Sequence, residues 1–156
     1  QITAPCSLKP VLSLKGCVMS IKEFRSGRGV GYGRRFITPA HTRIAIIPIG
    51  YGHGYPYALS QKGLVLIKGR RYPIAGTVSM DYIMVDLGMD DQIKIGDLAT
   101  IIGIDGEQEI SVHELAQKAN TIPYDILTGL SARIPRVYRR DGSEITEAEP
   151  DDRDEA

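Results

Sequence analysis

The feature that most constrains this chain is a series of short β-type runs separated by glycine-bearing turns. About seven or eight such runs follow one another at regular spacing, and helical periodicity is confined to residues 111–129. Short strands at regular spacing with few helices indicate an all-β barrel or sandwich. We therefore expect a mainly β fold, with one or two short helices near the C-terminus.

Turn signals locate several of the expected strands. Two β-rich runs predict a hairpin across Lys68-Gly69-Arg70, because a glycine-bearing turn between such runs is a hairpin signal. Asp105-Gly106 is a type I′ signal for a second hairpin. In a strand expected over residues 11–24, the apolar phase shifts by one residue after Gly16, which suggests a bulge.

The C-terminal third carries the helical signals. Ser111-Val-His-Glu114 is a capping box for a helix over residues 112–119. A second short helix is expected with Pro123 in its first turn and its end near Gly129. Residues 133–138 are then expected to return as a last strand.

The charge distribution divides the chain into a body and a tail. Residues 141–156 hold eight acidic residues against Arg153 alone, so residues 1–140 hold 18 basic and 11 acidic residues, although the whole chain is neutral. We expect one domain over residues 1–140 and an acidic, disordered tail over residues 141–156. The basic residues are spread along the chain without a stripe, which favours a solvated surface over a nucleic-acid interface.

Composition points to a cytoplasmic protein without a metal site. No apolar run reaches membrane-spanning length, and no signal segment opens the sequence. Cys6 and Cys17 form neither a metal spacing nor a disulfide framework, so we expect reduced thiols. The three histidines lack ligand spacing with cysteines or acids.

Tyr32 is the first candidate for chemistry. It stands among three glycines, Gly29, Gly31 and Gly33, which let another backbone or a ligand approach a strand end closely. The phenol has an ordinary pKa of about 10 and is a poor base at neutral pH unless cations stabilise the phenolate. Taken alone, however, a strand tyrosine more often packs a half-buried surface.

Five collinear segments give this tyrosine a context. The central three are Gly29-Val-Gly-Tyr-Gly33, Ile49-Gly-Tyr-Gly-His-Gly-Tyr-Pro56 and Ile74-Ala-Gly-Thr-Val-Ser-Met-Asp81. In that order and at those separations they resemble the C-terminal β domain of alanine racemases, the pyridoxal-phosphate-dependent family of fold type III. The opening Leu8-Lys-Pro-Val-Leu-Ser-Leu14 and the closing Leu130-Ser-Ala-Arg-Ile-Pro-Arg136 are similar to that family as well.

The resemblance implies a β-barrel domain that completes another subunit's active site. In this family an N-terminal (β/α)₈ barrel holds pyridoxal 5′-phosphate on a lysine, and two protomers associate head to tail as a homodimer. Tyr32 would then be the base that exchanges the α-proton on one face of alanine. Met80 would contact the substrate through its backbone, Tyr51 would line the narrow access passage, and Ser79 would lie in the cofactor's vicinity.

The implied activity is interconversion of L- and D-alanine, which supplies D-alanine for peptidoglycan. None of the lysines stands in the family's cofactor motif, so the resemblance implies that the cofactor lysine lies in the missing barrel and that the chain alone is inactive. The expected partners are the barrels of both protomers and the small substrate, with neither nucleic acid nor membrane.

Departures from the family pattern leave alternatives open. Arg34 and Arg35 follow the Tyr-Gly and add positive charge that could favour the phenolate. Other departures occur where the family often has an aspartate, arginines of the access passage and a phosphate-binding tyrosine: His53, Tyr57, Thr77 and Ala132. They allow a racemase of broader specificity, for serine or lysine. A stand-alone β-barrel that binds a partner or nucleic acid is the alternative from another functional class.

Overall fold

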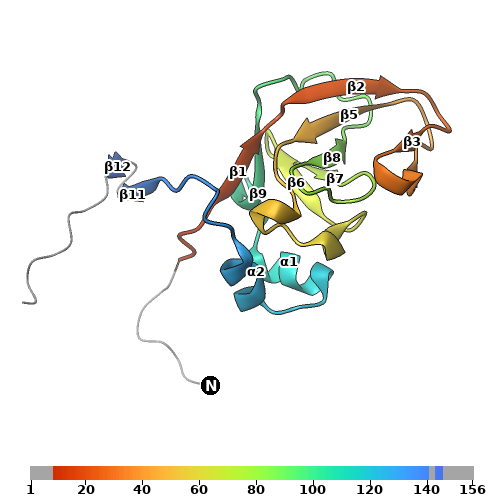
Figure 1. Cartoon of the computed structure of the whole chain (residues 1–156). Helices are drawn as coiled ribbons and strands as arrows, with labels where there is room; N and C mark the ends of the chain where they lie inside the picture. The colour runs from red at the N-terminus through yellow and green to blue at the C-terminus, as the bar shows by residue number, and fades with distance from the viewer. Residues whose placement is uncertain (1–8, 141–142, 146–156) are drawn as a thin grey trace, which may run out of the picture.

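Two antiparallel sheets enclose the main hydrophobic core. The computed structural model describes residues 9–140 and 143–145. The larger sheet has the order β1-β9-β6-β7, with β10 pairing to β9, and the smaller has the order β2-β5-β8 (Figure 1). An isolated bridge between Ile74 and Val85 links the two sheets. The strands of the larger sheet are β1 Leu14–Cys17, β6 Leu64–Ile67, β7 Arg70–Pro73, β9 Leu98–Asp105 and β10 Gln108–Ile110. Those of the smaller are β2 Ser20–Phe24, β5 Thr42–Ile47 and β8 Ile83–Asp86.

Two short hairpins lie at opposite ends of the molecule (Figure 1). One joins β3 Gly29–Val30 to β4 Phe36–Ile37, and the other pairs β11 Tyr138–Arg140 with β12 Ser143–Ile145. Two helices, α1 Val112–Ala119 and α2 Pro123–Gly129, cover one end of the core. The expected mainly β fold with two short helices near the C-terminus is therefore confirmed.

The core forms because β-branched strands bury both their faces. In β5, Ile44, Ala45 and Ile47 are all almost fully buried, since the strand is central in its sheet and is covered on both sides. Ala45 and Ile47 belong to the main cluster, to which helix α1 adds Leu115 and helix α2 adds Ile126. Full burial of such a side chain contributes about 1.5–3 kcal/mol, which makes this cluster the main source of stability.

The expected hairpins form, with one difference in turn geometry. Strands β6 and β7 are joined by Lys68-Gly69, where both residues have positive φ, at 51° and 72°, as a type I′ turn requires. In the β9–β10 hairpin, Asp105 pairs with Gln108, so the turn is Gly106-Glu107, and only Gly106 has positive φ. The type I′ prediction at residues 105–106 is therefore wrong, because the pairing extends one residue further.

The strand expected over residues 11–24 is divided in two because the chain crosses between the sheets. Strand β1 pairs with β9, whereas β2 pairs with β5. At the crossing, Val18 N–H donates to Asp97 O, next to β9 of the larger sheet. Met19 N–H donates to Ile46 O in β5 of the smaller sheet. The shift in register lies between Leu14 and Lys15 rather than at Gly16.

The C-terminal elements agree with expectation except in detail. The Ser111 hydroxyl accepts from Glu114 N–H at 3.1 Å, but the Glu114 carboxylate pairs with Arg71 at 2.7 Å, so only half of the capping box forms. The last strand begins at Tyr138 rather than at residue 133. Residues 131–134 form a turn instead, in which Ser131 accepts the N–H groups of Arg133 and Ile134. The expected tail lies outside the described residues except for 143–145, which form β12. No described helix has the length and apolar character needed to cross a bilayer.

A partly buried tyrosine–aspartate contact joins the larger sheet to the loop after β8. Tyr72 on β7 donates its phenol proton to Asp90 Oδ2 at 2.6 Å, and Arg70 reaches the same oxygen at 2.9 Å. Gln92 N–H donates to the other carboxylate oxygen at 2.9 Å. The bond from Tyr72 is the largest of the effects that lower the pKa of Asp90, while burial and Asp90 raise the pKa of Tyr72 to about 12.

We predict that Tyr72→Phe lowers the free energy of unfolding by about 1–3 kcal/mol at pH 7, because it removes a hydrogen bond to a charged group. The pKa of Asp90 is lowered in the folded state. The ionised Asp90 carboxylate therefore makes its full contribution to the free energy of unfolding above its unfolded-state pKa of about 4. That contribution is lost as pH falls through its lower folded-state pKa. Urea unfolding at pH 7 and at pH 3 should show a smaller loss at pH 3.

The matched control is Tyr124→Phe, since that side chain is 74% exposed. It should leave the free energy of unfolding unchanged at both pH values. An equal loss for Tyr72→Phe at pH 7 and pH 3 would contradict the charge-dependent contact.

Candidate functional site

Tyr32 projects from the β3–β4 hairpin instead of lying in a strand. It begins the one-turn helix η1 Tyr32–Arg34, and the flanking Gly31 and Gly33 both have positive φ, at 73° and 70°. The positive φ favours glycine at position 31, where a Cβ would lie 2.5 Å from Met84 Cε, the end of a flexible side chain. Tyr32 is 69% exposed. The prediction of a strand and the alternative of a half-buried packing role are both wrong, because the hairpin turns at this residue.

The glycine-rich loop over residues 50–54, from the second of the three central motifs, lies against the segment that carries Met80. Tyr51 N–H donates to Ser79 O at 3.0 Å, and Gly52 N–H donates to Met80 O at 2.8 Å. A Cβ on Gly50 would lie 2.1 Å from Ser79 O and 2.5 Å from Met80 O. The two segments can therefore approach this closely only with glycine at position 50.

A tight turn presents Met80. Ser79 N–H donates to the carbonyl of Tyr82 at 3.0 Å, which closes the turn, and Met80 is 48% exposed at its tip. The carbonyl of Met80 is occupied by Gly52, but its own N–H has no acceptor within residues 9–140 or 143–145. Asp81, next in the turn, lies 3.9 Å from Arg133, and both side chains are largely exposed.

One pocket of about 370 Å³ brings these segments together. Its lining residues are Tyr32, Tyr51, Tyr57, Thr77, Val78, Ser79, Met80, Asp81 and Tyr82. All four residues nominated from the sequence, Tyr32, Tyr51, Ser79 and Met80, therefore line the same cavity. The rings of Tyr51 and Tyr57 meet edge to face, with centroids 6.4 Å apart. Tyr82 was missed by the sequence analysis, and its position directly after the Met-Asp pair was the signal that could have found it.

The electrostatics of the pocket favour a neutral phenol on Tyr32. The pKa of Tyr32 is raised, first by a side-chain hydrogen bond with Tyr82 and then by the charge of Tyr82, with smaller effects of burial and Tyr51. Arg34 and Arg35 are not among these causes, so the expectation that they favour the phenolate is wrong for this chain. The Arg34 side chain instead folds over Gly29, where a Cβ would lie 2.6 Å from Arg34 Nε.

Two of the departures from the expected motifs lie outside the pocket. His53 accepts the Gly50 N–H on Nδ1 at 3.2 Å, so it stabilises the loop from within. The same loop is tied to the end of α2, since Ser131 N–H donates to His53 O at 3.2 Å. Ala132 lies beyond this contact and is exposed. Tyr57 and Thr77, in contrast, line the pocket, and the Thr77 hydroxyl donates to Tyr32 O at 3.3 Å.

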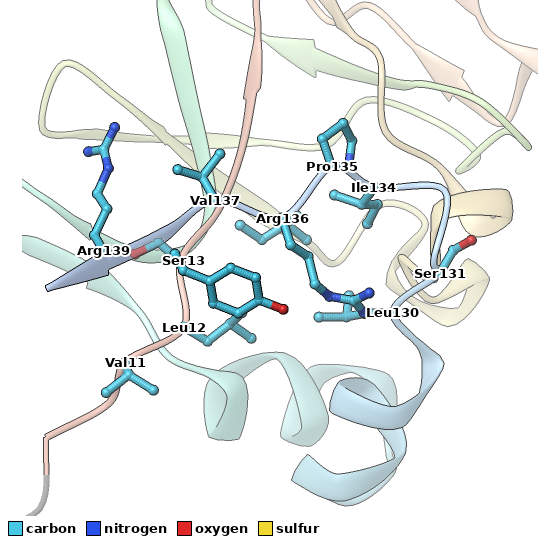
Figure 2. Close-up of a pocket in the computed structure, with 12 residues that line it drawn as sticks. Val11, Leu12, Ser13, Leu130, Ser131, Ile134, Pro135, Arg136, Val137 and Arg139 are labelled. Atoms are coloured by element: carbon cyan, nitrogen blue, oxygen red, sulfur yellow. The ribbon is translucent and has the colours of Figure 1, made fainter. Parts of the chain in front are cut away.

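A second cavity, of about 520 Å³, lies between the segment before β1 and the chain that follows α2. Figure 2 shows Leu12, Leu130, Ile134 and Arg136 around it. Its lining includes no carboxylate, lysine or histidine, and none of the nominated residues. Within the described chain, no three histidine, cysteine or acidic side chains are grouped to hold a metal.

Comparison with known proteins identifies a family match and close relatives. Residues 11–138 match the family model described as "Alanine racemase, C-terminal domain". The alanine racemase of Halothermothrix orenii is 44% identical over 85% of this chain, and alanine racemase 2 of Bacillus subtilis is 48% identical over 86%. This chain covers 35% and 34% of those proteins, so it spans about a third of their length.

Solved structures of similar proteins support the same family match. Alanine racemase from Bacillus anthracis, with bound L-Ala-P, superposes with a TM-score of 0.86 at 37% identity and covers 91% of this chain. Alanine racemase from Bartonella henselae, with covalently bound pyridoxal phosphate, superposes with a TM-score of 0.80 at 36% identity and covers 88%. The shares of those two structures that match are 36% and 37%.

We predict that Gly50→Ala destabilises the chain by about 2 kcal/mol or more, because the new Cβ would overlap two backbone carbonyls that cannot move independently. Gly129→Ala is the matched control, since its Cβ would meet nothing closer than 3.9 Å and alanine favours the helix. Urea unfolding should separate the two variants. Equal stability of both variants would show that the loop and the Met80 turn are not in close contact.

Proposed function

Since this chain belongs to the alanine racemase C-terminal domain family, we propose that it is the C-terminal domain of a pyridoxal-phosphate-dependent racemase that interconverts L- and D-alanine. The observation that carries the proposal is the single pocket lined by Tyr32, Tyr51, Ser79 and Met80. The D-alanine formed would serve peptidoglycan synthesis in the cytoplasm. The domain would comprise residues 1–140, followed by the acidic tail.

The rest of the enzyme would supply what this chain lacks. The chain spans about a third of its relatives, which leaves room for an N-terminal barrel. The pocket lining offers hydroxyl groups, a thioether and one carboxylate, but no amine that could bond to the cofactor's aldehyde. These residues would form one wall of a cofactor site, but none of them would bond covalently to the cofactor. We infer that the isolated chain is inactive and that a homodimer joins this wall to a second protomer's barrel.

Tyr32 would move the α-proton on one face of the substrate. Racemisation removes a proton from one face of the α-carbon and returns one to the other, and pyridoxal phosphate, when bound, acts as an electron sink for the resulting carbanion. An acid–base group must lie within hydrogen-bonding reach of its proton. The phenol of Tyr32 is exposed, so it would be accessible to a substrate held outside this domain. Because its pKa is raised in this domain, cations of the neighbouring subunit would have to stabilise the phenolate.

The other lining residues would bind and orient the substrate. The N–H of Met80, which has no acceptor among the residues that the structure describes, would donate to a substrate carboxylate. Tyr51 and Tyr57, whose rings meet edge to face, would narrow the path to Tyr32. Ser79 is 5% exposed and its hydroxyl has no partner within the described chain. A polar group of the assembled site or a bound water would satisfy that hydroxyl.

In the full-length protein, Tyr32→Phe should lower racemisation by about 10²- to 10⁴-fold, which is the usual contribution of a general acid–base group. The loss should be selective for one face. In D₂O, α-deuterium exchange should fall for one enantiomer of alanine and persist for the other, as measured by mass spectrometry.

Tyr124→Phe provides the control, since Tyr124 is exposed and lies outside the pocket. It should leave both exchange rates unchanged. Equal loss of exchange from both enantiomers in Tyr32→Phe would rule out the one-face role.

A racemase of broader specificity is the second candidate. It is favoured by the uncharged Tyr57 and Thr77, which line the pocket where the family often places arginines of the access passage. We expect alanine to remain the best substrate. Racemisation of alanine, serine and lysine by the full-length protein, followed by chiral chromatography, decides between the two. A higher kcat/KM for serine or lysine would favour the broader activity.

A further inference from the structure

We propose that an arginine cleft beside the β3–β4 hairpin binds a small ligand with linked phosphate groups, through Arg25, Arg28 and Arg34. The proposal does not depend on the racemase activity, because the cleft shares no lining residue with the pocket that contains Tyr32. Its starting point is the sequence over residues 25–35, which holds four arginines and no acidic residue.

Three of these arginines line one open cleft of about 540 Å³. The lining consists of Glu23, Phe24, Arg25, Arg28, Gly29 and Arg34, so its formal charge is +2 from three arginines and one glutamate. The Glu23 carboxylate lies 3.3 Å from His41, which is not part of the lining. Among the residues that the structure describes, none of the three arginines forms an ion pair. The cleft therefore carries positive charge without a matching anion from the described chain.

The turn that carries Arg25 and Arg28 is fixed by its backbone. Thr38, which is 1% exposed, donates its hydroxyl proton to Arg25 O at 2.7 Å and accepts the Arg28 N–H at 2.9 Å. Its own N–H donates to Arg28 O at 2.9 Å, and its carbonyl accepts the Gly27 N–H at 2.8 Å. These four bonds hold the Cα atoms of both arginines in place, although their side chains are exposed.

Arg34 reaches the same cleft from the hairpin. It has a φ of 48°, a left-handed conformation that is uncommon for a residue with a side chain and often marks a functional position. A Cβ on Gly29 would lie 2.8 Å from Arg34 Cβ and 2.6 Å from its Nε. Glycine at position 29 therefore leaves room for the stem of Arg34 as it enters the cleft.

Three guanidinium groups in one cleft suit linked phosphates. Each guanidinium presents five N–H donors in a planar fork, which binds phosphate oxygens two at a time. A diphosphate supplies several oxygens and at least two negative charges, whereas a single carboxylate supplies two oxygens and one charge. Bound between Arg28 and Arg34, such a ligand would also join the turn at residues 25–28 to the hairpin that carries Tyr32.

Isothermal titration calorimetry of the full-length protein with pyrophosphate tests the proposal. The double variant Arg25→Gln/Arg28→Gln should bind pyrophosphate about tenfold or more weakly than the wild type, because it loses hydrogen bonds between charged groups. The backbone bonds to Thr38 remain in this variant, and circular dichroism checks that it is folded. No racemisation is measured, so the result stands whether or not Tyr32 acts as a base.

Arg35→Gln is the matched control, since Arg35 follows Arg34 on the hairpin but does not line the cleft. It removes the same charge nearby and should weaken binding by less than about threefold, because exposed charges outside the site are screened by salt. Absence of pyrophosphate binding to the wild type would overturn the proposal. An equal loss of affinity in Arg35→Gln and in the double variant would also overturn it, since only the general charge of the hairpin would then matter.

A second probe distinguishes a small ligand from the phosphates of a nucleic acid. Pyrophosphate should bind at about 0.15 M NaCl more tightly than a fluorescently labelled single-stranded oligonucleotide, whose binding is followed by anisotropy. Tighter binding of the oligonucleotide, lost in Arg25→Gln/Arg28→Gln, would reject a small phosphate ligand in favour of a nucleic-acid interface.

Discussion

The candidate site depends on one close backbone contact, between the loop at Gly50 and the carbonyls of Ser79 and Met80. Two hydrogen bonds, from Tyr51 N–H and Gly52 N–H, join the segments, and no side chain at position 50 would fit between them. The contact sets the position of Tyr51 relative to Met80. It also gives a physical reason for the glycine at position 50 of the second motif, because only glycine lets these two backbones approach so closely.

The sequence predicted most reliably what local geometry decides. The β6–β7 hairpin, the Ser111 cap and the Pro123 start of α2 each follow from a residue's own conformational preference, and all three are present. The gathering of Tyr32, Tyr51 and Met80 was implied only by resemblance, since their segments are far apart in sequence. Its physical basis is the backbone pairing of the loop at Gly50 with the Met80 turn.

What the sequence missed depends on tertiary packing. Tyr32 was expected at the end of a strand, but positive φ at Gly31 and Gly33 reverses the chain there. Tyr82 was overlooked because an aromatic residue before a strand looks like ordinary β sequence. Its place in the same pocket as Tyr32 depends on how the hairpin folds over the smaller sheet. The upward pKa shift of Tyr32, opposite to the expectation from Arg34 and Arg35, has the same origin.

The contact between Gly54 and Gly129 links the tyrosine loop to the far side of the domain. A Cβ on Gly54 would lie 2.1 Å from Gly129 O, and the neighbouring bond from Ser131 to His53 runs in parallel. The chain beyond this point forms a wall of the second cavity (Figure 2). The loop at residues 50–54 and the chain after α2 are therefore joined by backbone contacts. A rearrangement at the end of α2 would displace this loop, and a ligand that orders the loop would order the chain after α2 as well.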